Sequence, residues 1–439
     1  AKRMRETVTF LRSDAEAFNA FNIANETMLL QRMTDYHQKQ KAYKTKNYSN
    51  VKFRWRPFQL AFILNSLESV LNPESKHRDD LDLIWVPTGG GKTEAYLFAI
   101  AAIIAYRRLT RKKGYQGVTV IMRYTLRLLT SQQFERAAKM ICALEYIRKT
   151  RGNLGETEVS IGLWIGEGTE NYLKNARSDY NEMCRADTII AAKKLNKFQL
   201  LNCPWCGKKH SIIPDEENHK KSISWGYKEI NNKNAYNMCC LTKDCPFNKG
   251  LPVYVVDESI YSVRPTLIFG TVDKFAQIPL KQQAQRLFGS DNPQKYNRPD
   301  LIVQDELHLI SGPLGSIVGL YEAGFDYILR NSNHHERGPK YIASTATIRN
   351  ASDQIKGIFD RNVQLFPPRG IIATDNFFVK ETKQGHGRKY FGIMGTGKSQ
   401  MTVEVHTMAA MLQSAVKLGR DASSEELFWT IAGYFNSLR

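Results

Sequence analysis

The feature that most constrains the fold is a run of glycines between a predicted strand and a predicted helix. Residues 81–86 form a short apolar run, which is typical of a buried strand, and residues 95–106 are rich in alanine, leucine and isoleucine, which is typical of a packed helix. A strand, a glycine loop and a helix N-terminus direct several backbone N–H groups to one place, where phosphate oxygens bind. This order of elements predicts a site for a nucleoside triphosphate. The residues that we expect to hold it are Thr88, Gly89, Gly90, Gly91, Lys92, Thr93 and Glu94.

The side chains after the glycines fit the chemistry of ATP and Mg²⁺. Lys92 is placed to reach the β- and γ-phosphates, and Thr93 to hold the magnesium ion. Glycine is needed before them because a Cβ atom would block the close approach of the backbone to the phosphates. The segment departs from the full G-x-x-x-x-G-K-[ST] pattern at one position, since Val86 stands where the first glycine would be.

A second segment, Gly392–Ser399, fits the full phosphate-loop pattern letter for letter. It is not followed by an apolar strand that ends in carboxylates, and residues 400–406 do not look strongly helical. Because a short pattern gives false matches and its context decides, we interpret this segment as a glycine-rich turn between a strand and a helix in a second domain.

Another predicted strand ends in acidic residues, as the second half of an ATPase site requires. Residues 300–304 are followed by Asp305 and Glu306, and His308 comes two positions later. We expect Asp305 to bind Mg²⁺ through water and Glu306 to orient and polarise the attacking water. His308 is placed to link hydrolysis to the rest of the protein. The phosphate loop comes first and the acidic strand second, which is the order that this pairing needs.

Two more segments complete the predicted ATPase site. Ser344, Thr345 and Thr347 follow a further apolar run, and their small hydroxyl side chains are placed to bridge the acidic strand to a nucleic-acid track. Gln59 lies upstream of the phosphate loop, and its amide carries both a donor and an acceptor with which to read the edge of an adenine base.

Strands and helices alternate along most of the chain, which predicts an α/β fold with a parallel sheet covered by helices on both faces. Residues 1–50 look like a polar, basic helical extension. The sheet domain is expected in two parts, 51–165 and 265–365, around a cysteine-rich insertion at 166–264. A linker rich in proline and glycine then leads into 366–439, the beginning of a second domain. The expected strands are 81–86, 118–124, 159–165, 265–270, 300–304 and 340–344.

Charge and cysteine usage restrict the partners and the compartment. The formal net charge of +19 favours a polyanionic partner such as DNA or RNA. The longest apolar run has about 12 residues, too few to span a bilayer, so no membrane partner is expected. Seven cysteines, an odd number, argue against a secreted disulfide framework. No signal peptide is visible, and we expect a cytoplasmic protein.

Two cysteine pairs predict a structural zinc site in the insertion. The first pair is Cys203-Pro-Trp-Cys206, and the second is formed by Cys245 with Cys240 or the adjacent Cys239. Two such pairs suit a tetrahedral Zn²⁺ with four thiolates. Cys240 is the favoured fourth ligand because C-x4-C is the more usual spacing, although His210 or His219 can substitute. A redox C-x-x-C is the main alternative, and Cys142 and Cys184 are interpreted as buried or incidental thiols.

The motifs, taken in order, resemble those of superfamily 2 helicases. Thr88–Glu94, Asp305–His308 and Ser344–Thr347 look like motifs I, II and III, and residues 56–59 resemble the adenine-reading Q motif. The resemblance implies a RecA-like P-loop motor domain in this chain and the start of a second RecA-like domain. Residues 122–127 and 271–275 resemble motifs Ia and Ic, which touch the nucleic-acid backbone in that superfamily. The residues expected to contact phosphates are therefore Arg123, Arg127 and Lys274.

Longer phrases, among them WVPTGGGKTEAYL, MRYTLRLLTSQQF and QDELHLISGPLG, resemble the helicases of DISARM, a bacterial antiphage defence system. That resemblance covers most of residues 51–350 and implies DNA as the substrate, phage restriction as the biology and a partner protein, DrmB. One departure stands out, because superfamily 2 enzymes carry an arginine-bearing motif VI in the second RecA-like domain. No segment resembling it occurs before Arg439, and we expect residues 1–439 alone to hydrolyse ATP poorly.

The sequence leaves two functional classes open. The first is an ATP-driven motor that moves on or opens DNA, and the second is an ATP-gated clamp or scaffold that binds nucleic acid without separating strands. An RNA-directed helicase is a third possibility. A small-molecule kinase is disfavoured because the acidic strand with His308 and the Ser344 segment would have no role in it.

Overall fold

The computed structural model describes residues 1–439 except positions 34, 50, 87–89, 112, 125–126, 166–172, 187–190, 192–193, 196–199, 210, 213–223, 231–234, 277, 279–280, 290, 331–336, 347–350, 369, 372–375, 379–389, 419–430 and 434–439. The chain divides into two compact units, Ala1–Lys380 and Glu381–Arg439, which are described separately. Among the described residues, no helix combines the length and the apolar character needed to cross a membrane.

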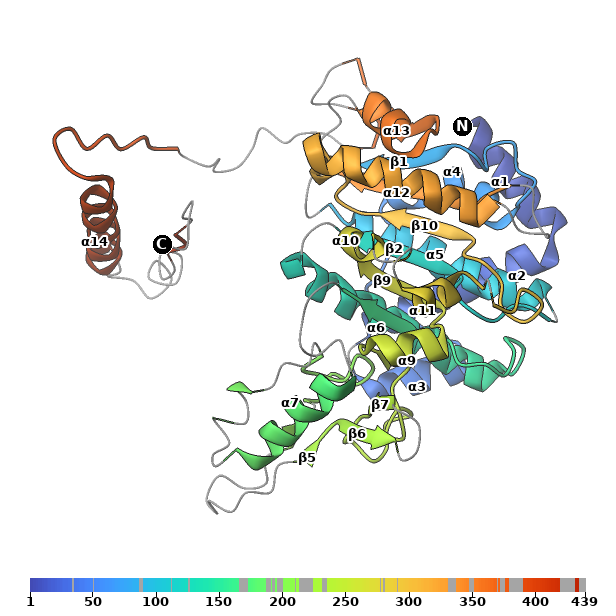
Figure 1. Cartoon of the computed structure of the whole chain (residues 1–439). Coiled ribbons are helices and arrows are strands. Elements are labelled where there is room, and N and C mark those ends of the chain that lie inside the picture. Colours follow the sequence, from blue (N-terminus) through green and yellow to red (C-terminus); the bar gives the residue numbers. More distant parts are fainter. Residues whose placement is uncertain are drawn as a thin grey trace. The chain divides into compact units, whose positions relative to one another are not determined.

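A parallel sheet forms the centre of the first unit (Figure 1), as predicted. Each of the six expected strands is present within a few residues of its predicted bounds, and the sheet extends by one further short strand at each edge. Within the described part of the chain the order is β12 (Val363–Phe366), β1 (Leu81–Trp85), β11 (Lys340–Thr345), β10 (Leu301–Gln304), β2 (Val120–Tyr124), β9 (Leu267–Thr271), β3 (Ile161–Trp164) and β8 (Val253–Tyr254).

Side chains alternate along the strands and fill two cores, one on each face of the sheet. In β1, Leu83 belongs to one core and Ile84 to the other, because successive residues of a strand point to opposite faces. Helices lie on both faces of the sheet (Figure 1), and its central strands are buried, whereas the edge strand Val363–Phe366 is partly exposed. One face is covered by α4 (Pro57–Leu71), α5 (Lys92–Thr110) and α6 (Arg127–Arg151), and the other by α9 (Asp257–Val263), α10 (Val272–Phe275), α12 (Gly312–Arg330) and α13 (Ala351–Phe359).

The first 50 residues are built into the core. Helix α2 (Ala15–Arg32) packs against α5 and α6, and it buries Ala17, Ala20 and Ala24, whose small side chains let the helices approach closely. Helix α1 (Lys2–Ser13) packs against α4, and Arg3 on it forms a two-pronged ion pair with the fully buried Asp82 of β1. The polar composition that predicted an extension belongs to the outer faces of these helices and to α3 (Tyr36–Thr45).

The insertion contains short elements between β3 and β9. The described ones, besides β8 and α9, are α7 (Leu173–Arg185), β4 (Ser211–Ile212), β5 (Ser224–Trp225), β6 (Tyr227–Ile230) and β7 (Ala235–Met238), with β4–β5 and β6–β7 paired antiparallel. Between β9 and β11 lie α11 (Gln282–Gln285) and the two 3₁₀ turns η2 (Arg286–Phe288) and η3 (Leu307–Leu309).

In the second unit, the segment after the rival phosphate-loop match is helical, so our expectation for residues 400–406 was wrong. Helix α14 spans Gln400–Leu418, and the Ser399 hydroxyl accepts a hydrogen bond from the backbone N–H of Thr402 at 3.2 Å. This cap explains why the helix begins there despite the β-branched residues of its first turns. Among the described residues of this unit, no carboxylate strand accompanies the loop.

Candidate functional site

The phosphate loop joins β1 to α5, as the sequence predicts. Helix α5 begins at Lys92, and Gly91 caps it with a φ of 94°, a left-handed backbone that glycine adopts without strain. A Cβ atom on Gly91 would lie 2.8 Å from Nε2 of Gln59, so a side chain there would displace the Gln59 amide from the loop. Thr88 and Gly89 lie outside the described residues, whereas Gly90 and Gly91 line a cavity of about 310 Å³.

Gln59 reaches the phosphate loop directly. Its Nε2 donates to the carbonyl oxygen of Gly91 at 2.7 Å, and its Oε1 accepts from the backbone N–H of Arg56 at 2.9 Å. Arg56 in turn donates from Nη1 to the carbonyl oxygen of Gly90 at 2.6 Å. The start of α4 therefore holds the loop in place. The amide of Gln59 keeps one further donor and one further acceptor position, so adenine recognition stays a prediction.

Lys92 and Thr93 face the same cavity as the acidic strand end. The Lys92 ammonium donates to the carbonyl oxygen of Val86 at 2.7 Å. Burial lowers the pKa of Lys92, while the nearby carboxylates of Glu306 and Asp305 act in the opposite direction. The phosphate loop and the acidic strand thus lie together, since Lys92, Thr93, Asp305 and Glu306 all line this cavity.

The carboxylate of Asp305, at the carboxyl end of β10, accepts four of the hydrogen bonds described in the structure. The hydroxyls of Tyr96 and Tyr124 donate to Oδ2, the first at 2.8 Å. On the other oxygen, Oδ1 accepts from the hydroxyl of Ser344 and from the backbone N–H of Glu306, the latter at 2.9 Å. The sequence motifs predict Ser344 beside this strand but give no signal for either tyrosine, because neither belongs to a motif with a catalytic role.

Glu306 and His308 continue the site beyond Asp305. Glu306 has a φ of 48°, which is rare for a residue with a side chain and typical of functional positions. Burial raises the pKa of Glu306, and the charge of Asp305 adds to the effect. His308 Nδ1 lies 3.5 Å from Glu306 Oε2 and 3.2 Å from Thr345 Oγ1. His308 therefore links the acidic strand to the end of β11, and the coupling role of Thr345 stays a prediction. Thr347 lies outside the described residues.

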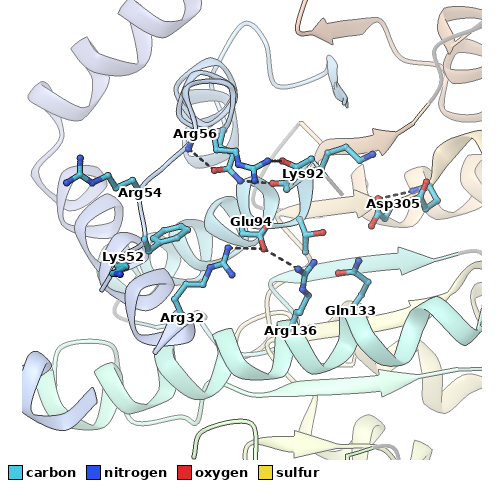
Figure 2. Close-up of a pocket in the computed structure, with 15 residues that line it drawn as sticks. Arg32, Lys52, Arg54, Arg56, Lys92, Glu94, Gln133, Arg136 and Asp305 are labelled. Atoms are coloured by element: carbon cyan, nitrogen blue, oxygen red, sulfur yellow. Dashed lines mark hydrogen bonds and ion pairs between the residues drawn. The ribbon is translucent and has the colours of Figure 1, made fainter. Parts of the chain in front are cut away.

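The rim of the cavity is more basic than the motifs suggest (Figure 2). Glu94, predicted as part of the site, points between two arginines, with its Oε1 3.8 Å from Arg32 and 3.5 Å from Arg136. These arginines come from α2 and α6, so no local pattern could have joined them to the phosphate loop. The other rim residues that sequence analysis missed are Lys52, Phe53, Arg54 and Gln133.

Two of the three predicted phosphate contacts are buried, which corrects the prediction for them. Arg123 is 1% exposed and pairs with Glu322, and Lys274 is 2% exposed with its Nζ 2.7 Å from Asp257. Neither cation can meet a phosphate in this conformation, because each balances a carboxylate inside the fold. Of the predicted contacts, Arg127 starts α6 at the carboxyl edge of the sheet, and its side chain lies outside the described residues.

A second candidate site is the cysteine cluster of the insertion, hereafter the knuckle (residues 203–207 and 239–247). Within the described residues, one group of four sulfurs lies within 4.8 Å of one another, and Cys239 is not among them. Sγ of Cys206 and Sγ of Cys240 are 3.5 Å apart, too far for a disulfide and close to the roughly 3.8 Å between thiolates on a tetrahedral Zn²⁺. The four cysteines are Cys203, Cys206, Cys240 and Cys245.

Local backbone bonds form the turns that bring these cysteines together. The N–H of Gly207 donates to the carbonyl oxygen of Cys203 at 2.9 Å, and Gly207 has a φ of 73°. In the second half, the N–H of Cys240 donates to the carbonyl oxygen of Phe247 at 2.9 Å. Cys142 is buried away from this cluster, as predicted. The side chains of Cys184 and His210, like all of His219, lie outside the described part of the chain.

The knuckle packs on the main core through aromatic rings. Trp205 is 1% exposed, and its ring centroid lies 4.7 Å from that of Tyr146 on α6 and 5.8 Å from that of Phe247. The ammonium of Lys39, from α3, lies 4.4 Å from the Trp205 ring centroid and donates to the Trp205 carbonyl oxygen. The cysteine cluster is thus continuous with the core that covers one face of the sheet.

Comparison with known proteins agrees with this arrangement. Residues 57–166, which run from α4 through the phosphate loop to the end of β3, match the family model of the DEAD/DEAH box helicases. The part of the chain that carries the phosphate loop is therefore similar to that of a DEAD/DEAH box helicase.

One relative matches along the whole chain. The chain is 36% identical to DISARM protein DrmA of Bacillus paralicheniformis over an alignment of 489 residues that covers all of this chain and 42% of that protein's length. Among solved structures, the DUF1998 helicase MrfA is 13% identical with a TM-score of 0.40, covering 75% of this chain and 33% of its own. The helicase Lhr of Mycobacterium smegmatis bound to ssDNA and AMP-PNP has the same identity and TM-score, covering 74% and 27%. At these TM-scores, neither likeness bears on the ligands of this chain.

Proposed function

We propose that the protein is an ATP-dependent DNA helicase or translocase subunit, which binds DNA through a basic surface and couples ATP hydrolysis to movement or remodelling. The observation that supports this most directly is the convergence of Lys92 and Thr93 with Asp305 and Glu306 around one cavity. These residues come from segments about 210 positions apart, and they fit Mg²⁺-ATP in type and order. Similarity to DISARM protein DrmA supports a role in antiphage defence.

We assign the residues of the cavity separate roles in binding phosphate, holding Mg²⁺ and activating water. Lys92 and the N–H groups at the start of α5 would bind the phosphates, and Thr93 with Asp305 would hold Mg²⁺. The bound ion supplies neutralisation of charge on the phosphates. Glu306 would orient the attacking water and accept its proton, for which a carboxylate with a raised pKa is suited. His308 and Thr345 would relay the change at Glu306 to the end of β11, with Ser344 and Thr347 in the same coupling segment.

The test is Glu306→Gln in the full-length protein. We expect ATP turnover to fall by about 10²- to 10⁴-fold, as for loss of a positioned base, while ATP binding stays near the original level. Glu135→Gln is the control, because this exposed glutamate on α6 pairs only with Lys139 among its described ion pairs. Equal turnover in Glu306→Gln and the original protein would contradict the assignment.

A motor and a clamp differ in what ATP does. Repeated hydrolysis that displaces a labelled strand or moves a bound protein indicates the motor. One round of nucleotide-dependent DNA retention, with no displacement, indicates the alternative, an ATP-gated clamp or scaffold. The same assay with single- and double-stranded RNA decides the substrate class, since no described residue distinguishes the two polymers.

We further propose that the four knuckle cysteines, Cys203, Cys206, Cys240 and Cys245, bind a structural Zn²⁺. Sulfurs within 4.8 Å of one another, with three of the four residues fully buried, fit a closed thiolate site. A closed site leaves no position for a substrate, so the ion would stabilise the knuckle and take no part in hydrolysis. The insertion at 166–264 would then be a segment of the helicase domain that a structural metal ion stabilises.

The biological setting is also proposed. We propose that the protein acts in the cytoplasm, in antiphage defence, together with a partner of the DrmB type. Similarity to DISARM protein DrmA supports the defence role. The corresponding experiment is phage plating on cells that carry the whole defence system with either the original protein or Glu306→Gln. Equal protection by both would separate the defence role from ATP hydrolysis.

A further inference from the structure

Two buried tyrosines stand between the predicted metal ligands and have no assigned role. Tyr96 is on the second turn of α5, and Tyr124 is the last residue of β2. Their hydroxyl oxygens are 3.0 Å apart, and both hydroxyls donate to Oδ2 of Asp305. Tyr96 Oη also lies 3.2 Å from Oγ1 of Thr93. The two tyrosines therefore join the phosphate-loop helix, the acidic strand and a third strand at one carboxylate oxygen.

The direction of these bonds follows from the number of protons. A phenol carries one proton, so Tyr96, which gives its proton to Asp305, must accept from Thr93. Thr93 then keeps its oxygen lone pairs for a cation.

We propose that Tyr96 and Tyr124 are positioning residues for Mg²⁺-ATP, which fix the Asp305 carboxylate and the Thr93 hydroxyl at the spacing that one Mg²⁺ requires. This inference rests on the proposed ATPase function and adds residues to it. Partners that orient a metal ligand without touching the metal are worth about 10- to 100-fold in metal affinity. Here the orientation is tight, because donors reach Asp305 on both oxygens.

Tyr124 has a second consequence. It ends β2 directly before the segment that leads to Arg127, where a contact with the nucleic-acid backbone is predicted. A shift of this strand end would move the Tyr124 hydroxyl and with it the carboxylate of Asp305. Tyr96, by contrast, lies on the phosphate-loop helix and has no such connection. The two tyrosines therefore share an effect on the metal but differ in their link to DNA.

The experiment uses Tyr96→Phe and Tyr124→Phe in the full-length protein. Each substitution removes one hydroxyl and keeps the ring, which for Tyr124 is stacked on Phe269 at 5.1 Å. The readout is binding of a fluorescent, non-hydrolysable ATP analogue titrated with Mg²⁺, and separately in EDTA. We expect the Mg²⁺ concentration for half-maximal binding to rise about tenfold in both variants, with unchanged binding in EDTA.

Tyr106→Phe is the matched control. Tyr106 lies on the same helix, and its hydroxyl also donates to an aspartate, Oδ2 of Asp14 at 2.8 Å, far along α5 from the cavity. The control should leave the Mg²⁺ titration unchanged. DNA stimulation of turnover should fall more in Tyr124→Phe than in Tyr96→Phe.

The outcomes separate the two proposals. If the original protein binds no nucleotide, the proposed ATPase function fails. If it binds nucleotide and both phenylalanine variants titrate with Mg²⁺ like the control, the ATPase function stands and the positioning role is wrong. Because two variants probe the same carboxylate from different elements, a folded sample of either one decides the question, and thermal unfolding shows which are folded.

Discussion

The nucleotide cavity and the knuckle are held together in different ways. The cavity collects residues from α2, α4, α5 and α6 and from the segments that follow β1 and β10, and the parallel sheet brings these two segments together because strand ends meet at one edge. The knuckle has short turns and few strands, and four sulfurs bring its halves together. A large scaffold can place reactive side chains through packing alone, whereas a small segment needs a cross-link. The comparison predicts that each region can be damaged separately.

The largest expected effect is on the knuckle. In Cys203→Ser/Cys206→Ser, we expect the bound zinc to fall to the background level, because two of four thiolates are lost. Metal analysis measures this, and Cys142→Ser, which removes a buried thiol outside the cluster, should keep the metal. The knuckle should unfold while ATP binding stays largely intact. A loss of ATP binding equal to the loss of zinc would show that the two regions are one unit.

The second largest expected effect is a loss of stability of the central sheet. Asp82→Ala removes the carboxylate that pairs with Arg3 at 2.7 Å and with Lys340 at 3.2 Å, all of them largely buried. Arg3 would then remain inside the fold without a carboxylate, and Lys340 could stay there only by losing its proton. The free energy of unfolding should therefore fall by about 3–5 kcal/mol, as measured in urea. Nucleotide binding should weaken with the loss of folded protein, while zinc stays bound. Asp360→Ala, at an exposed ion pair, is the control, and an equally stable Asp82→Ala would contradict the role of this cluster.

A smaller effect is a dependence of stability on pH that belongs to the sheet alone. Burial lowers the pKa of Lys340 to about 8. The charge of Asp82 acts in the opposite direction, and the charge of Arg3 adds to the lowering. In the unfolded chain this amine keeps its proton up to a pKa of 10.5, so between the two values the unfolded state binds more protons and stability rises with pH.

From pH 7 to pH 9 this contribution to the free energy of unfolding should grow by about 1 kcal/mol. Urea unfolding at both pH values gives the change in the free energy of unfolding from pH 7 to pH 9 for the original protein and for Lys340→Met. The contribution of Lys340 is the difference between these two changes. The variant should lack the increase. An equal pH response in both proteins would show that Lys340 keeps its proton inside the fold.

The smallest expected effect separates surface contacts from buried ion pairs. Arg127→Ala should weaken DNA binding only a few-fold at moderate salt and lower the salt slope of log K by about 1, as for one lost phosphate contact. Arg123→Ala should instead reduce stability and leave that slope unchanged, since Arg123 pairs with Glu322 inside the fold. A slope change in Arg123→Ala would restore the original prediction for that residue.

Sequence patterns predicted the parts of this protein whose signal is local. The strand before Lys92, the acidic pair at Asp305 and the C-x-x-C turn each occupy a few consecutive residues, and all three lie where expected. Patterns did worse where the outcome depends on packing. Arg123 looked like a surface cation beside a motif, and only the fold shows the carboxylate of Glu322 beneath it. The polar sequence of α1 likewise gave no sign that Arg3 pairs with Asp82 in the central sheet.

The order of motifs along the chain was enough to establish a parallel α/β domain with a triphosphate loop and an acidic strand, because each motif carries its own local geometry. The tertiary structure alone decided which side chains meet across it. It brought Tyr96 and Tyr124 to the same oxygen of Asp305, placed Arg32 beside Glu94 and seated Trp205 against Tyr146. Such pairs join distant positions through close packing, and a single sequence holds no record of that packing.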